Sequence, residues 1–228
     1  MPRQIQISVS MMCADPLGLR EVLDVLVAGR IEWLHIDVMD GHYVPNFTLG
    51  PDFCRALSAA CPIPLDVHLM VEKPEQHTAL FTGAPGTRVS FHPETARDPM
   101  RLIEKLRQAG ASPAIAIGPY MSVESCAPLL PHVDQVTIMT VIPGRAGQKL
   151  LPFCVPKITR ARELIAAAGS PAQVEVDGNV SWANIPAMVS AGADVLVAGS
   201  TSIFSQGRVS PEAIGRMRAL AAESLPAC

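Results

Sequence analysis

The sequence predicts an α/β fold, and more specifically a single (β/α)8 TIM barrel domain over residues 1–228. Short apolar runs alternate with longer segments of helical spacing, which is typical of parallel strands joined by helical crossovers. The apolar runs number eight, and eight strands in 228 residues match a barrel near the short end of its size range.

These patterns predict the position of each element. The strands are expected at residues 5–12, 33–38, 65–70, 87–91, 113–117, 135–139, 173–176 and 195–198. The helices are expected at residues 17–28, 53–60, 99–109, 155–168 and 182–191. Ala109-Gly110 and Ala191-Gly192 end two of these helices, as C-terminal glycine capping favours.

A doubly wound open sheet is the alternative architecture. Its glycine-rich turn after the first strand is absent, because Ser10-Met11-Met12-Cys13 stands there. No linker, charge run or low-complexity stretch divides the chain, so one domain is expected.

The composition of the chain limits which kinds of molecule it is expected to bind. The formal net charge is −3 and aromatic residues make up 4% of the chain, so neither a basic stripe nor a stacking platform for nucleic acid is expected. No apolar run approaches the roughly 18 residues that span a bilayer, and residues 1–4 lead directly into the first strand without a signal sequence. The six scattered cysteines are expected to be reduced. We expect a cytoplasmic homo-oligomer with a small-molecule substrate.

Two histidines and two aspartates fall at or just past the ends of expected strands. His35 and Asp37 lie two residues apart, so their side chains point to one face of the second strand. His68 lies near the end of the third expected strand, and Asp177 directly follows the seventh. Barrel strands converge on one rim, so one divalent metal ion could bind all four residues. Two nitrogen and two carboxylate ligands suit Zn, Mn, Fe or Co, among which the sequence does not choose.

The two aspartates are also candidate catalytic groups. Asp37 and Asp177 would face each other across the barrel mouth and could act as acid and base at a carbon next to a carbonyl. A metal ion would stabilise the enediolate that this proton transfer creates. The alternative is that both aspartates are helix N-caps or salt-bridge partners.

Three loops contain small residues suited to an anionic substrate. Backbone N–H groups after the seventh and eighth strands occupy the usual phosphate position of barrels, and a third loop at residues 143–148 could cover the substrate. Methionines at strand ends would form an apolar wall. The residues expected to contact substrate are Ser10, Met39, His68, Met70, Met139, Gly144, Arg145, Ala146, Gly147, Gly178, Asn179, Gly199 and Ser200.

These motifs resemble the ribulose-phosphate 3-epimerase family along essentially the whole chain. The resemblance lies in Ser10, HIDVMDGHYVPN (35–46), LDVHLM (65–70), PGRAGQ (143–148), EVDG (175–178) and AGS (198–200). It implies a (β/α)8 barrel and a divalent metal ion on His35, Asp37, His68 and Asp177. It also implies Asp37 as proton acceptor, Asp177 as proton donor, and a phosphate held by the late loops.

Within that family, the chain resembles the D-allulose-6-phosphate 3-epimerase branch more than the pentose enzymes. Ser10-Met11-Met12-Cys13, Phe91-His92-Pro93-Glu94-Thr95 and Met139-Thr140-Val141 carry this likeness. The expected substrates are D-allulose 6-phosphate with D-fructose 6-phosphate, or D-ribulose 5-phosphate with D-xylulose 5-phosphate. Four residues depart from the family pattern and leave that choice open, namely Gly118, Ile142, Arg145 and Asn179.

Two other functions compete with epimerisation. A decarboxylase or lyase on the same barrel would place a lysine between aspartates at a strand end, but Val38 and Met39 lie between Asp37 and Asp40. A catalytically silent sugar-phosphate binder would need neither aspartate.

Overall fold

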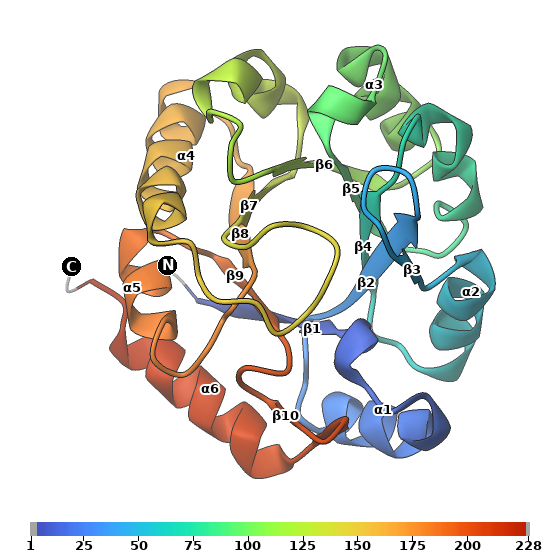
Figure 1. Ribbon diagram of the computed structural model, residues 1–228, viewed down its shortest axis with the longest axis vertical. Coiled ribbons are helices and arrows are strands. Elements are labelled where there is room, and N and C mark those ends of the chain that lie inside the picture. The colour runs from blue at the N-terminus through green and yellow to red at the C-terminus, as the bar shows by residue number, and fades with distance from the viewer. Residues whose placement is uncertain (1–3, 227–228) are drawn as a thin grey trace.

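The computed structural model describes residues 4–226, which contain a closed barrel of parallel strands surrounded by helices (Figure 1). Every barrel strand pairs in parallel with its neighbours, and β1 pairs with both β2 and β9, which closes the barrel. The expected (β/α)8 fold is confirmed. The barrel strands are β1 (Gln6–Ser10), β2 (Trp33–Asp40), β4 (Leu65–Met70), β5 (Arg88–Phe91), β6 (Ser112–Ile117), β7 (Gln135–Met139), β8 (Gln173–Asp177) and β9 (Val195–Ala198).

Three short strands lie outside the barrel. β3 (Phe47–Thr48) pairs antiparallel with the end of β2, so β4 and β8 are the third and seventh barrel strands. β10 (Phe204–Ser205) and β11 (Arg208–Val209) form a small hairpin. These additions lengthen the loops after β2 and β9 without interrupting the barrel.

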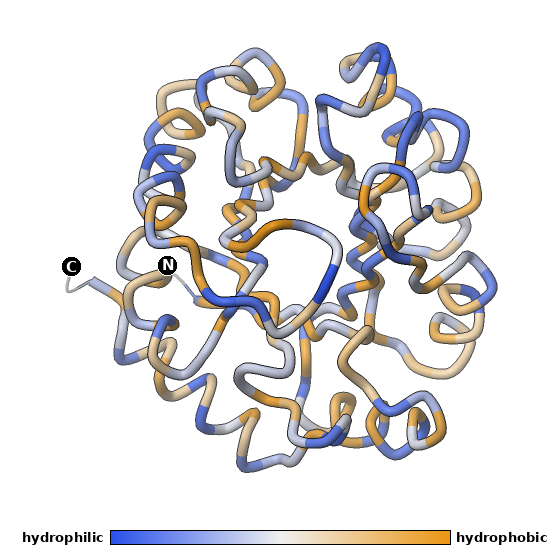
Figure 2. The backbone as a smooth tube through the Cα atoms, in the orientation of Figure 1, coloured by the Kyte–Doolittle hydropathy of each residue, from blue (hydrophilic) through white to orange (hydrophobic). Residues whose placement is uncertain are grey.

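The helices surround the barrel (Figure 1). Along them, hydrophobic and hydrophilic segments alternate in Figure 2, as expected for helices with one buried face. Asp98 caps α3 by accepting a 3.1 Å hydrogen bond from the backbone N–H of Arg101. The helices are α1 (Leu19–Ala28), α2 (Pro51–Ala60), α3 (Pro99–Gln108), α4 (Val155–Ala167), α5 (Ile185–Ala191) and α6 (Pro211–Glu223).

The structure differs from the expected elements at several positions. β1 ends at Ser10 rather than residue 12, because Met11–Cys13 forms a turn of 3-10 helix. α6 was not expected. A 3-10 helix, Glu124–His132, takes the place of an α-helix after β6, and it contains two prolines that cannot donate backbone hydrogen bonds.

The two faces of the barrel strands bury different side chains. Apolar residues such as Leu34, Ile36 and Val67 form the core together with the helices. The polar positions between them, including His35 and Asp66, are also buried, and they form hydrogen bonds with one another. The barrel interior is therefore a polar layer enclosed by an apolar one.

Two expectations from composition concern cysteines and membranes. Within residues 4–226, Cys13, Cys54, Cys61, Cys126 and Cys154 are free thiols, and Cys228 lies outside the described residues. None of the helices described for the chain combines the length and apolar character that crossing a bilayer requires.

Candidate metal centre and active site

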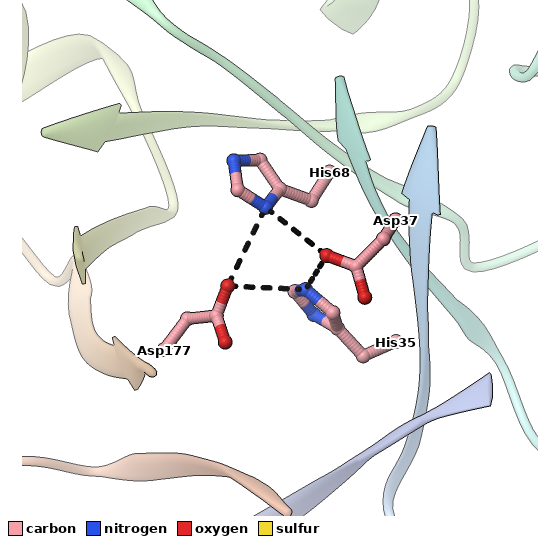
Figure 3. A group of neighbouring side chains, drawn as sticks. All are labelled: His35, Asp37, His68 and Asp177. Carbon is pink, nitrogen blue, oxygen red and sulfur yellow. Dashed lines mark ion pairs between the residues drawn. The ribbon is translucent and has the colours of Figure 1, made fainter. Parts of the chain in front are cut away.

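His35, Asp37, His68 and Asp177, from β2, β4 and β8, form one cluster (Figure 3). Nε2 of His35 lies 3.5 Å from Oδ1 of Asp37 and 3.8 Å from Oδ2 of Asp177. Nδ1 of His68 lies 3.6 Å from each of the same two oxygens. One ligand atom from each residue therefore lies within 4.8 Å of the others, so these atoms surround a common point.

The two histidine nitrogens test whether a metal ion fits this point. Nε2 of His35 and Nδ1 of His68 are buried and have no hydrogen-bond partner in the described chain. Buried polar atoms are normally satisfied, and an orphan atom calls for a water or an ion. Both nitrogens point toward the two carboxylates (Figure 3). The donor set therefore fits a divalent metal ion.

The strand register explains why these residues meet. In the parallel pairing of β2 and β4, Asp37 stands beside His68. Ser10 at the end of β1 stands beside His35, and its hydroxyl donates a 2.9 Å hydrogen bond to Oδ2 of Asp37. Asp177 lies beside Met139 on the opposite side of the barrel. Each side chain is therefore placed by a barrel strand, which is a rigid support.

The charges at the cluster attract cations. Burial alone lowers the pKa of His35, but the carboxylates of Asp37 and Asp66 raise it, and the resulting pKa lies well above the usual value. Burial opposes ionisation of Asp37, yet His35 and His68 hold the pKa of its carboxyl below the usual range. A divalent metal ion competes with protons for the same nitrogens.

A second polar layer, which the sequence reasoning missed, lies beneath the cluster. Oδ2 of Asp66 is 2.9 Å from Nδ1 of His35 and accepts a 2.8 Å hydrogen bond from Ser8. Gln135 donates a 2.9 Å hydrogen bond to Glu175. Asp66 and Glu175 each lie two residues before a proposed ligand, and that period was the signal that could have identified them.

A cavity of about 70 Å³ lies above the cluster. Asp37 and Asp177 line this cavity, whereas His35 and His68, although His68 was predicted to contact substrate, are not among its lining residues. The structure therefore brings the other predicted substrate contacts around one pocket. These lining residues are Ser10, Met39, Met70, Met139, Gly144, Arg145, Ala146, Gly147, Gly178, Asn179, Gly199 and Ser200.

Residues 143–148, here named the covering loop, cross the barrel mouth in Figure 1. Asn46, which follows β2, donates a 2.9 Å hydrogen bond to the carbonyl oxygen of Gly144. Gln148 donates to the carbonyl oxygens of Ile142 and Arg145, at 2.5 and 2.9 Å. The first bond joins the loop to the segment after β2, and the other two lie within residues 142–148 and fix the shape of the loop beside the cavity.

The four residues that depart from the family pattern lie near this mouth. Ile142 and Arg145 are exposed, and no ion pair of Arg145 occurs within residues 4–226. Asn179 has a left-handed backbone conformation with φ 46°. A Cβ atom at Gly118 would lie 3.8 Å from Oε1 of Glu94, so a side chain at position 118 would approach that carboxylate.

Comparison with known proteins supports the resemblance. The family model described as "Ribulose-phosphate 3 epimerase family" matches residues 6–204. Ribulose-phosphate 3-epimerase 1 of Cupriavidus necator is 39% identical over 202 residues, which cover 87% of this chain and 84% of that protein. Ribulose-phosphate 3-epimerase of Treponema pallidum is 36% identical over 200 residues, which cover 88% of this chain and 92% of that protein.

This chain is also similar to a solved structure, in fold alone. The crystal structure of phosphoribosyl anthranilate isomerase from Thermus Thermophilus has a TM-score of 0.63 at 13% identity, covering 96% of this chain and 99% of that chain. The two relatives above carry the ribulose-phosphate name, and the allulose-6-phosphate branch stays a prediction. On the match of the family model and the identity to these relatives, this chain belongs to the ribulose-phosphate 3-epimerase family.

Proposed function

We propose that the chain is a metal-dependent ketose-phosphate 3-epimerase. The observation that carries this proposal is the pair of carboxylates, Asp37 and Asp177, at the base of one pocket. They come from β2 and β8, and an oxygen of each lies within 3.8 Å of the same two histidine nitrogens. Such a pair can exchange a proton at carbon 3 of a ketose, next to the carbonyl at carbon 2.

In this proposal, Asp37 accepts the proton from carbon 3 and Asp177 donates a proton to the opposite face, which inverts the carbon. The Ser10 hydroxyl orients the Asp37 carboxylate through its 2.9 Å hydrogen bond. The side chains of Asp37 and Asp177 are only 7% and 16% exposed, so bulk water has little access to them. Met39, Met70 and Met139 add an apolar wall to the same pocket.

His35, Asp37, His68 and Asp177 are proposed to hold one divalent metal ion. The two nitrogen and two carboxylate donors suit Zn, Mn, Fe or Co. When bound, such an ion supplies Lewis-acid stabilisation for the negative charge that develops on the ketose oxygen. Asp66 would support the site by holding Nδ1 of His35, which leaves Nε2 free to coordinate.

The phosphate is proposed to bind the backbone N–H groups of Gly178, Asn179, Gly199 and Ser200. All four residues line the pocket on the side of β8 and β9. Gly178 has φ 115°, and a Cβ atom there would lie 2.6 Å from Cγ2 of Val141, so only glycine suits this position. A close backbone approach of this kind is typical of phosphate-binding loops in barrels.

Neither competing function is favoured by this geometry. No lysine occurs among the described residues that line the pocket, which argues against a lysine-dependent decarboxylase. A silent binder would leave the paired carboxylates without a role. The homo-oligomer also stays a prediction, which the solution mass of the protein would test.

The proposed function is tested by NMR detection of deuterium exchange at carbon 3. The metal-loaded protein is mixed in deuterated water with D-ribulose 5-phosphate or D-allulose 6-phosphate in parallel. Exchange with formation of the epimer supports the proposal and identifies the preferred chain length. Stoichiometric metal binding without exchange in any phosphoketose would favour the silent binder.

A further inference from the structure

His92 is a buried histidine that the proposed reaction leaves without a role. It follows directly after β5, and its side chain has no exposed surface. Its Nε2 atom lies 3.0 Å from Nε2 of His68, and the two ring centroids are 5.1 Å apart. His92 therefore contacts a proposed metal ligand on the side away from the metal centre.

The proposed role of His68 fixes the direction of this hydrogen bond. A neutral imidazole carries one proton, on either nitrogen. If Nδ1 of His68 coordinates a metal ion, the proton resides on Nε2. That N–H must then donate to Nε2 of His92, which accepts through its lone pair. The proton of His92 consequently resides on Nδ1.

Glu94 and Tyr43 face that second nitrogen. Nδ1 of His92 lies 3.5 Å from Oε1 of Glu94, and the same oxygen accepts a 2.8 Å hydrogen bond from the Tyr43 hydroxyl. The Tyr43 ring also packs against the His92 ring, with centroids 4.8 Å apart. Nδ1 of His92 is buried and makes no hydrogen bond within residues 4–226, so the Glu94 oxygen at 3.5 Å is the negative group that faces it.

The opposite direction of the bond conflicts with these surroundings. It would require His92 to donate from Nε2, and its Nδ1 lone pair would then face the negative oxygen of Glu94. The His68 proton would reside on Nδ1, facing the metal centre, where it would prevent coordination. Glu94 is thus the group that selects between the two arrangements.

We propose that His92 and Glu94 are positioning residues for the metal ion, and that they act by holding His68 in the tautomer whose Nδ1 can coordinate. This inference rests on the proposed metal-dependent function. Neither residue is among the four that surround the centre. Glu94 also lines a neighbouring cavity of about 290 Å³, together with Tyr43, Gly118 and Ile142, so its carboxylate can be reached from outside the pocket.

Cobalt(II) binding to metal-stripped protein tests this proposal without any assay of turnover. The dissociation constant is measured by competition with a chelator, and the visible spectrum of bound cobalt reports the ligand geometry. His92→Phe and Glu94→Leu should each weaken binding by about 10–100-fold, the usual effect of losing an outer partner of a ligand histidine. Glu94→Gln keeps an oxygen that can accept from His92 and should stay within about threefold of the wild type.

A matched control comes from the same loop as Tyr43. His42 is an exposed histidine whose side chain is 70% exposed, so His42→Gln should leave cobalt affinity and spectrum unchanged. Circular dichroism confirms that each variant is folded. Folded His92→Phe and Glu94→Leu variants with wild-type affinity and spectrum would overturn the proposal while leaving the metal-dependent function intact. A wild-type protein that binds no cobalt would instead overturn both.

A second measurement needs no substitution. Long-range proton–nitrogen NMR of the zinc-loaded wild-type protein identifies which imidazole nitrogens carry protons. Protons on Nε2 of His68 and Nδ1 of His92 are expected. A His92 ring protonated on Nε2 alone would refute the proposed arrangement, even if the variants failed to fold.

Discussion

The side-chain amide of Asn179 donates a 2.5 Å hydrogen bond to the carbonyl oxygen of Gln148, which joins the loop after β8 to the end of the covering loop. Asn184 fixes the orientation of that amide by donating to Oδ1 and to the backbone oxygen of Asn179, at 2.7 and 3.0 Å. A residue that departs from the family pattern thus connects the proposed phosphate site to the covering loop.

Asn179→Gly should loosen the covering loop while keeping the backbone of the phosphate site. Glycine adopts φ 46° without strain, so the change removes only side-chain bonds, namely the bond to Gln148 and the bond that Asn184 donates to Oδ1. A net contribution of about 1 kcal/mol for a hydrogen bond corresponds to roughly a fivefold rise in the Michaelis constant. Hydrogen exchange of a peptide covering residues 142–148 should accelerate in parallel, and unchanged exchange would contradict this explanation.

Asp37→Asn and Asp177→Asn should each lower turnover by about 10²–10⁴-fold, or more, because proton transfer is lost and a proposed ligand is altered. If each aspartate serves one face, a variant should still exchange the carbon 3 proton of one epimer without converting it into the other. The deuterium NMR assay with each epimer separately shows this asymmetry. Wild-type turnover in either variant would disprove the two-carboxylate mechanism.

Glu175→Gln should stabilise the protein at higher pH. Burial and repulsion from Asp66 raise the pKa of the Glu175 carboxyl well above its usual value of 4.5. The folded state therefore retains a proton that the unfolded state releases, so the stabilisation is complete below pH 4.5 and is lost as the pH rises toward the folded-state pKa. Glutamine mimics the protonated acid and escapes this loss.

Melting temperatures of metal-saturated wild type and Glu175→Gln should therefore diverge between about pH 5 and pH 8, with the variant gaining as the pH rises. Glu104→Gln, at an exposed position of α3, is the matched control and should show no such trend. A difference between wild type and Glu175→Gln that stays constant with pH would mean that Glu175 is ionised in the folded protein.

Arg145→Phe should raise the Michaelis constant for pentose and hexose phosphates alike. Among the described residues that line the pocket, Arg145 is the only arginine or lysine, and it lies on the covering loop. An exposed cation near a phosphate contributes about 1 kcal/mol or less, so a rise of up to about fivefold is expected. Lys149→Met, next to the same loop but outside the pocket lining, serves as control. A changed preference between the two sugars would instead assign Arg145 to substrate length.

The barrel and the cluster of four could be predicted because both follow from local pattern. Alternation of apolar strands with helices indicates the fold, and the spacing of His35 and Asp37 places two side chains on one strand face. Convergence of strand ends then brings His68 and Asp177 to the same rim.

The period of two could have placed Asp66 and Glu175 on the same strand face as the ligands, but which groups the supporting residues contact depends on the register between strands. Asp66 contacts His35 across 31 positions of sequence, and His92 contacts His68 across 24. α6 differs, because its signal was present. Ser210 caps that helix by accepting a 3.2 Å hydrogen bond from the N–H of Ala213, and Pro211 occupies its first turn.

The polar layer inside the barrel limits how this chemistry could be transplanted. His35 needs Asp66, Asp66 is held by Ser8, and Glu175 is held by Gln135. Grafting the rim loops and the four ligands onto a barrel with an aliphatic interior would remove the contact with Asp66. The His35 ring would then be free to rotate. A designer would have to transfer Ser8, Asp66, Gln135 and Glu175 together with the four ligands.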